Sequence, residues 1–271
     1  MATKPQAQLE PLMAHGPYDV LRGDLALVGL PGVVYTPRGG LGLPGIAFGH
    51  GWMQPPALYR GLLRHLASWG IVTAAPATQR GPLPSHRLFA TDLETTLRII
   101  TSVRLGPGGI SVDPERLGLA GHSTGAGAAI LAAAAGQPDV QAVASVAPAE
   151  TVPSAIQAGR TLQIPGLHLA AAEDLVAPPD AHARAIAAAW GGPVQLRSLA
   201  KSTHLSVTEG MHWTRLLLHG KPRYGTQRLV RGLFTAFFLR HLAGESEHQE
   251  LLDGELKRAP IELDRQAERT R

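Results

Sequence analysis

One serine lies between two glycines in the segment Gly121-His122-Ser123-Thr124-Gly125. The apolar residues 116–122 predict a buried strand, and the alanine-rich residues 124–136 predict a helix. A serine at a sharp turn from strand to helix exposes its hydroxyl beside the free N–H groups of the helix N-terminus. This setting favours a nucleophilic serine; the alternative is that Ser123 only caps a tightly packed helix.

A serine hydroxyl needs a base, and the base needs an acid that orients it. Where a nucleophile follows a strand in this way, the chain order is serine, then acid, then histidine. Asp174 and His204 each follow an apolar run closely, so both are expected at the carboxyl ends of strands. The sequence therefore predicts a catalytic triad of Ser123, His204 and Asp174.

Other residues remain open for two of these roles. Glu173 is the immediate neighbour of Asp174, and Glu150 ends the preceding apolar run. The chain contains 12 histidines, so a match for the base is easy to find. The alternatives for the acid are Glu173 and Glu150, and those for the base are His212, His182 and His219, the last two being expected at exposed positions.

An oxyanion formed at Ser123 would need two N–H donors. One is expected from the backbone of Thr124, the residue after the nucleophile, and the other from the glycine-rich loop at residues 48–56. We assign the second donor to the backbone of Trp52, with Met53 as the nearest alternative. The residues expected to contact substrate in an open cleft are Gly51, Trp52, Met53, His122, Ala149 and Leu205.

Strand-like and helix-like segments alternate along most of the chain. Strands are expected at residues 32–37, 45–51, 71–77, 116–122, 140–148, 166–172 and 194–200. Helices are expected at residues 56–70, 88–103, 124–136, 178–191 and 226–244. The alternation predicts an α/β fold with a mostly parallel central sheet and helices on both faces.

The 271 residues, 44% of them hydrophobic, are enough for one α/β domain of ordinary size. We expect a loose lead-in at residues 1–16, a single domain at residues 17–244 and a charged tail at residues 245–271. The tail is rich in charges of both signs and poor in apolar residues. Such a composition favours a solvated or frayed segment over one that docks on the domain.

Composition and charge argue against several other classes of function. The formal net charge is +4, but the arginines and lysines are scattered, which argues against nucleic-acid binding. The chain has no cysteine, which excludes disulfides, thiolate metal sites and cysteine nucleophiles. No apolar run is long enough for a membrane span, and residues 1–20 lack the apolar core of a signal peptide. A cytoplasmic location is therefore expected, unless the protein carries a secretory leader outside this sequence.

Four motifs together resemble the lid-less α/β-hydrolases, which include cutinase-like poly(ethylene terephthalate) hydrolases and dienelactone-hydrolase-like serine esterases. The motifs are GHGW at residues 49–52, GHSTG at 121–125, EDLVAP at 173–178 and STHLS at 202–206. The resemblance covers residues 15–243. It implies an α/β-hydrolase fold without a lid domain, favours Asp174 over Glu173 as the acid, and matches His204 to the base and Trp52 to the aromatic residue of the oxyanion loop.

The chain departs from these families at several positions. The polyester hydrolases usually have methionine at the position of Thr124 and tryptophan at that of Ala149, and their C-terminal disulfide cannot form here. Dienelactone hydrolases proper use a cysteine where this chain has Ser123.

The expected activity is hydrolysis of small to medium carboxylic esters or of polyesters, without metal or cofactor. The alternatives are an acyltransferase or an amide or thioester hydrolase with the same triad, and a non-catalytic binding protein. The sequence does not define an oligomeric state.

Overall fold

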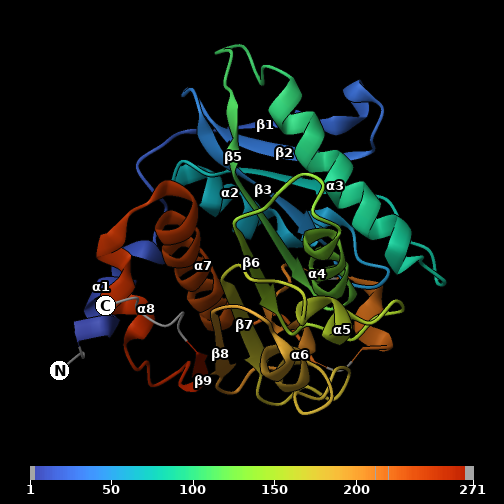
Figure 1. Cartoon of the computed structure of the whole chain (residues 1–271), viewed down its shortest axis with the longest axis vertical. Coiled ribbons are helices and arrows are strands. Elements are labelled where there is room, and N and C mark those ends of the chain that lie inside the picture. The colour runs from blue at the N-terminus through green and yellow to red at the C-terminus, as the bar shows by residue number, and fades with distance from the viewer. Residues whose placement is uncertain (1–3, 211, 219, 266–271) are drawn as a thin grey trace.

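The computed structural model describes residues 4–210, 212–218 and 220–265. Within them, nine strands form one sheet in the order β1-β2-β4-β3-β5-β6-β7-β8-β9 (Figure 1). The strands from β4 to β8 in this order run parallel, whereas β1, β2 and β9 pair antiparallel at the edges. The strands are β1 (Val20–Asp24), β2 (Gly32–Pro37), β3 (Leu43–Gly49), β4 (Val72–Pro76), β5 (Val112–His122), β6 (Ala142–Val146), β7 (Gly166–Ala171), β8 (Val194–Leu199) and β9 (Ile261–Arg265).

Helices cover both faces of this sheet, as the alternation of segments predicts (Figure 1). One face packs against α1 (Lys4–Leu12), α2 (Arg60–Ser68), α7 (Tyr224–Phe238) and α8 (Gln249–Asp253). The other face packs against α3 (His86–Ser102), α4 (Thr124–Ala135), α5 (Ala155–Gly159) and α6 (Ala183–Ala189). The mostly parallel sheet between two helical layers is an α/β architecture, as the sequence predicts.

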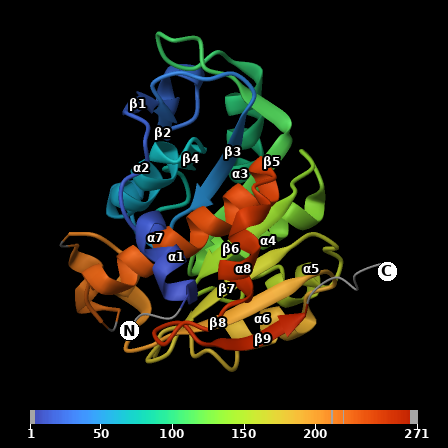
Figure 2. The same cartoon turned by 90° about the vertical axis from the view of Figure 1, so that its left-hand side faces the viewer.

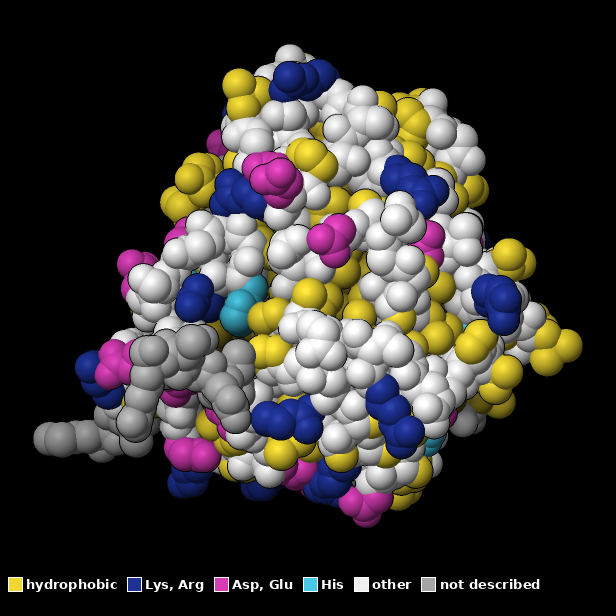
Figure 3. All heavy atoms as spheres, viewed as in Figure 1, with side chains coloured by type: hydrophobic (Ala, Val, Ile, Leu, Met, Phe, Trp, Pro, Cys, Tyr) yellow, Lys and Arg dark blue, Asp and Glu magenta, His cyan; other side chains and the backbone are white. Residues whose placement is uncertain are grey.

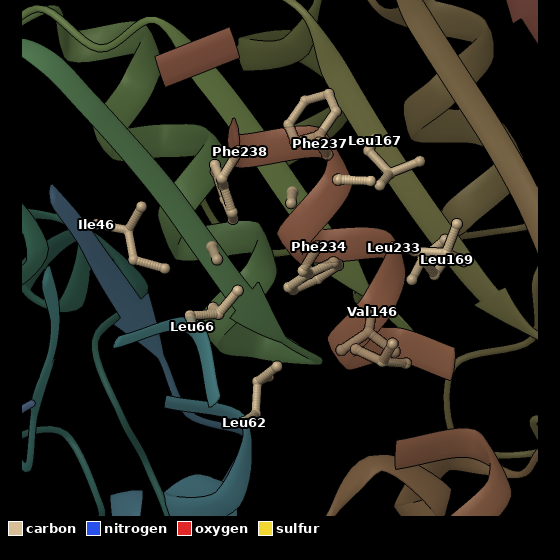
Figure 4. Packing of buried hydrophobic residues seen from close by; sticks show 14 of the residues in the cluster. Ile46, Leu62, Leu66, Val146, Leu167, Leu169, Leu233, Phe234, Phe237 and Phe238 are labelled. Carbon is tan, nitrogen blue, oxygen red and sulfur yellow. The ribbon is translucent and has the colours of Figure 1, made fainter. Parts of the chain in front are cut away.

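Adjacent residues of one strand serve the two opposite cores, because side chains alternate across a sheet. Ile46 and Phe48 of β3 belong to the core beneath α7, whereas Ala47 between them belongs to the core beneath α3 and α4. Phe234 and Phe238 of α7 face strand residues across the first core (Figure 4). Strands buried on both faces explain why the sequence shows continuous apolar runs rather than alternation.

The first residues of the chain do not form the loose lead-in that composition suggested. Residues 4–12 form α1, which lies against α7 and α8, with Leu9 and Leu12 buried (Figure 2). The segment looked loose because only these two apolar residues, three apart, mark its inner face. Their spacing places both on one side of a helix.

The charged C-terminal segment also packs on the domain, contrary to the expectation of a solvated tail. Residues 249–253 form α8, and residues 261–265 pair with β8 as the ninth strand (Figure 2). The buried members of this segment are Leu251, Leu252, Leu256 and Ala259. Four small or aliphatic side chains are enough to pack this segment on the domain, because the charged side chains of an edge strand can point into solvent.

Charges are interspersed on the face of the molecule seen in Figure 3, where lysine and arginine side chains lie among acidic and apolar ones. Among the described helices, none combines the length and the apolar character that crossing a membrane requires.

Candidate active site

Ser123 lies at the turn between the end of β5 and the start of α4, as predicted. Its backbone has φ 56° and ψ −129°, a conformation that non-glycine residues rarely adopt and that costs about 1–3 kcal/mol. Ser123 occupies the N-cap position of α4, but its hydroxyl makes no capping bond there, so capping does not account for this hydroxyl. Its carbonyl oxygen instead accepts from the N–H groups of Ala126, Gly127 and Ala149 at 3.0–3.2 Å. The surrounding backbone therefore holds the strained turn in place.

The two glycines of the motif are required by the space around this turn. A Cβ on Gly121 would lie 2.5 Å from the carbonyl oxygen of Gly125, and one on Gly125 would lie 2.3 Å from the carbonyl oxygen of His50. Real Cβ atoms do not approach backbone so closely. The end of β3, β5 and the start of α4 can thus meet only without side chains at these positions.

The structure brings together the three residues predicted as a triad. His204 begins the short 3-10 helix at His204–Val207 after β8, and Asp174 lies in the loop after β7. The Ser123 hydroxyl lies 2.8 Å from His204 Nε2, and His204 Nδ1 lies 2.7 Å from Asp174 Oδ2. All three residues are at least 96% buried. The carboxylate can only accept, so Nδ1 donates to it and Nε2 is left to accept the serine proton.

Asp174 divides its two oxygens between the histidine and the backbone. Burial tends to raise the pKa of its carboxyl, but hydrogen bonds more than compensate and the pKa is lowered. Oδ2 accepts from His204, while Oδ1 accepts from the N–H groups of Val176 and Ala177, both at 2.9 Å. These donors keep the carboxylate ionised and fix its orientation toward the imidazole.

The alternative acids lie elsewhere. Glu173 is exposed, and the Oε2 atom of Glu150 accepts from the N–H of Ile156 at the start of α5. The alternative bases are also occupied otherwise: His182 Nδ1 accepts from the N–H of Glu150, and His212 Nδ1 contacts the hydroxyl of Thr214. His219 lies outside the described residues.

The loop predicted to supply an oxyanion donor forms a tight turn after β3. The N–H of Gln54 donates to the carbonyl of Gly51 at 3.0 Å, and Met53 at the third position of the turn has φ 54°. A positive φ at this position is the mark of a type II turn. The indole N–H of Trp52 donates to the carbonyl of Pro82 at 3.0 Å, which fixes the ring on the loop before α3. Thr124 is the first residue of α4, where N–H groups have no partner inside the helix.

Four of the six residues expected to contact substrate are buried. Trp52 and Met53 keep part of their surface exposed. The buried four are Gly51, His122, Ala149 and Leu205. The candidate nucleophile Ser123 and base His204 are buried to a similar extent, so burial does not remove these four residues from the predicted contacts.

Two buried residues near His122 were not predicted. The Tyr59 hydroxyl lies 2.7 Å from His122 Nδ1 and also contacts the side chain of Gln54, which ends the turn of Trp52. Nothing local in the sequence singles them out, because 63 residues separate Tyr59 from His122.

The candidate metal-binding group in the described part of the chain lies outside this centre. Among the described residues, Glu245, Glu247 and His248 have ligand atoms within 4.8 Å of one another, but both acids are exposed and the group follows α7. It shares no residue with Ser123, His204 or Asp174.

A parallel sheet with a strained serine turn at the end of a central strand defines the α/β-hydrolase class. The chain matches the PET hydrolase-like family, also called PETase, over residues 7–212. It belongs to that family, and the resemblance noted in the sequence motifs is thereby confirmed. A search of curated proteins found no match.

Proposed function

We propose that the protein is a serine carboxylic-ester hydrolase in which Ser123 is the nucleophile, His204 the base and Asp174 the orienting acid. The observation that carries the proposal is the continuous hydrogen-bond chain from the Ser123 hydroxyl through His204 to Asp174. Membership of a family of ester hydrolases supports the same reaction class.

In the first half of the reaction, Ser123 Oγ attacks the ester carbonyl carbon while its proton passes to His204 Nε2. Asp174 stabilises the imidazolium that forms, and stays ionised itself. In this proposal the backbone N–H groups of Thr124 and Trp52 hold the oxyanion, a donor being worth about 3–4 kcal/mol in comparable sites. The tetrahedral intermediate expels the alcohol, which takes the proton from His204, and an acyl-enzyme remains.

In the second half, water attacks the acyl-enzyme and gives a proton to His204. The second tetrahedral intermediate releases the carboxylic acid, and Ser123 recovers its proton. Each turnover consumes one ester bond and one water molecule. None of these steps requires a metal or cofactor.

The substrates that fit best are small or medium esters and accessible polyester chains. Apolar side chains stand exposed on the loops that surround the candidate nucleophile at the carboxyl ends of the strands. Val152 follows β6, Leu175 follows β7, and Leu83 lies between β4 and α3; these residues are 83%, 72% and 95% exposed. Such a rim suits an apolar ester at the surface better than a single charged ligand.

Replacement of Ser123 by alanine tests the proposal. We expect S123A to fold as the wild type does but to lose turnover of p-nitrophenyl butyrate and labelling by a fluorophosphonate probe. The matched control is Ser102→Ala at the exposed end of α3, which should retain both. Substantial ester turnover in S123A would contradict the proposal, as would failure of the wild type to label.

A further inference from the structure

The hydroxyl of Tyr59 is the centre of a buried polar cluster that the proposed reaction does not use. Three groups reach its oxygen: the N–H of Gly51 at 3.0 Å, His122 Nδ1 at 2.7 Å and the side-chain amide of Gln54. Tyr59, His122 and Gln54 are each at most 1% exposed. Burying polar groups costs free energy unless they are hydrogen-bonded. A hydrogen-bonded cluster of this kind beside the candidate site is therefore expected to have a role.

Hydrogen-bonding rules give this cluster a direction. His122 Nε2 lies 2.9 Å from the carbonyl oxygen of His204, which can only accept, so Nε2 carries the proton and donates. Burial lowers the pKa of His122 to about 3, and the ring is therefore neutral with a bare Nδ1. Nδ1 can then only accept, and the hydroxyl beside it is that of Tyr59, which keeps its proton because burial raises its pKa.

The oxygen of Tyr59 in turn accepts from the loop after β3. The N–H of Gly51 is the donor. Gln54 turns its Oε1 atom toward the Tyr59 hydroxyl, so this oxygen and His122 Nδ1 are the two acceptors beside the single tyrosine proton. Hydrogen bonds thus connect the N–H of Gly51 through the Tyr59 hydroxyl and the ring of His122 to the backbone carbonyl of His204.

The packing around this chain of hydrogen bonds is tight. A Cβ on Gly51 would lie 2.7 Å from Gln54 Oε1, 2.9 Å from His122 Nδ1 and 3.1 Å from the Tyr59 hydroxyl. The ring of His122 also lies against that of His204, with centroids 4.8 Å apart. The cluster therefore touches both the loop of Trp52 and the candidate base.

We propose that Tyr59 and His122 are positioning residues, which hold the loop of the oxyanion donor and the backbone of His204 in register with each other. The inference rests on the proposed function, because it is this reaction that needs both parts in one geometry. A neutral His122 also adds no charge beside the imidazolium that forms on His204. The side chain of His122 acts from beneath the site and does not contact substrate.

Replacement of Tyr59 by phenylalanine removes only the central hydroxyl. We expect Y59F to lower kcat for p-nitrophenyl butyrate about tenfold or more and to change KM less than about twofold. This pattern is expected when the geometry of the catalytic groups is disturbed and substrate binding is not. The matched control is Tyr35→Phe on β2, a buried tyrosine outside the cluster, which should leave kcat and KM unchanged. An unchanged kcat in folded Y59F would overturn the proposal.

Two replacements of His122 separate positioning from packing. In His122→Gln the amide nitrogen can stand in for Nε2 and donate to the carbonyl of His204, whereas in His122→Leu nothing can. We expect H122L to lose about 100-fold in kcat and H122Q to recover at least tenfold of that loss. Equal activity of the two folded variants would overturn the proposal.

Fluorophosphonate labelling tests the reaction class separately from the role of Tyr59 and His122. If the wild type reacts with the fluorophosphonate probe and S123A does not, the reaction class stands whatever Tyr59 and His122 do. With the reaction class standing, the kcat values of Y59F, H122L and H122Q alone decide the positioning role.

Discussion

Gly49 and Gly125 meet backbone to backbone at the start of α4. A Cβ on Gly49 would lie 2.4 Å from the carbonyl oxygen of Gly125, and a Cβ on Gly125 would lie 2.3 Å from the carbonyl carbon of Gly49. The turn that carries Ser123 is thus pressed against the strand end that leads to Trp52. Both halves of the candidate oxyanion site depend on this contact.

Replacement of Gly125 by alanine should therefore damage both stability and activity. Because backbone atoms block the new Cβ, we expect G125A to lose at least about 1–3 kcal/mol in the free energy of unfolding, the usual cost of overpacking. Ester turnover should fall further than stability explains, since the elbow must shift. Urea unfolding and kcat/KM measure the two effects. Gly39→Ala is the control, because a Cβ there meets nothing within 4 Å; equal behaviour of the two variants would refute the argument.

Replacement of Asp174 by asparagine tests the role of the carboxylate. The amide oxygen can still accept from the two backbone N–H groups, so the amide nitrogen is turned toward His204 Nδ1. His204 must then carry its proton on Nε2 and cannot accept that of Ser123. We expect kcat to fall about 10⁴-fold, as in triads changed in this way, with folding retained.

The neighbouring acid provides the control for this change. Glu173→Gln removes a charge one residue away, on an exposed side chain, and should leave kcat within about twofold. If E173Q lost as much activity as D174N, the assignment of the acid to Asp174 would be wrong.

The sequence predicted most of the helices and strands that bury regular apolar patterns. The expected strand at residues 32–37 coincides with β2, and Leu93, Leu97 and Ile100, expected on one helical face, are all fully buried in α3. Such patterns are local consequences of burial, and a single sequence displays them directly. The triad was predictable for a related reason, because strand ends bring its members to one edge of the sheet.

Contacts between distant segments could not be predicted in the same way. β9 contains only two apolar residues and becomes a strand because β8 offers it a free edge. The link from Tyr59 to His122 likewise depends on how the 3-10 helix at Pro56–Tyr59 meets β5, and no sequence pattern pairs the two residues. Tertiary pairing, rather than propensity, decides the structure of such segments.

Arg197 on β8 holds the C-terminal segment in place. Its guanidinium is fully buried and donates to the carbonyl oxygens of Leu252, Gly254 and Ala259 at 2.6–2.9 Å, and to Gln195 Oε1 at 2.7 Å. Replacement by methionine would leave the carbonyls without these donors. We expect R197M to lose about 2–4 kcal/mol in the free energy of unfolding and to become sensitive to proteolysis at residues 249–265.

An exposed pair on the same segment gives the comparison. Arg184 on α6 forms a salt bridge with Glu262 of β9 at 2.8 Å, and its side chain is 41% exposed. Arg184→Met should cost less than about 1 kcal/mol, because solvent screens such pairs. If R184M released the segment and R197M did not, the surface pair rather than the buried arginine would be the anchor.

Three buried histidines and the partly buried His241 make stability depend on pH. Burial lowers the pKa of His122 and His168 to about 3 and that of His65 and His241 to about 4, from an ordinary value of 6.5. Below pH 6.5 the unfolded chain takes up protons at these residues while the folded chain does not. The free energy of unfolding should therefore fall as the pH drops from about 6.5 to 4, by at most about 1.4 kcal/mol per pH unit for each histidine. The lowered pKa of Asp174 acts only at lower pH, as its carboxylate becomes protonated.

Replacement of His65 by glutamine isolates one of these contributions. His65 Nε2 lies 2.9 Å from the carbonyl oxygen of Leu12, and the glutamine amide can donate there without titrating. Urea unfolding of the wild type and H65Q at several pH values between 7 and 4 measures the slope of stability against pH. Between pH 6 and pH 4.5 we expect the slope of the free energy of unfolding against pH to be smaller for H65Q than for the wild type. The difference should correspond to close to one bound proton, because the unfolded chain of H65Q binds one proton fewer. Parallel slopes would show that His65 takes up its proton equally in the folded and unfolded chain, and that burial does not keep it neutral.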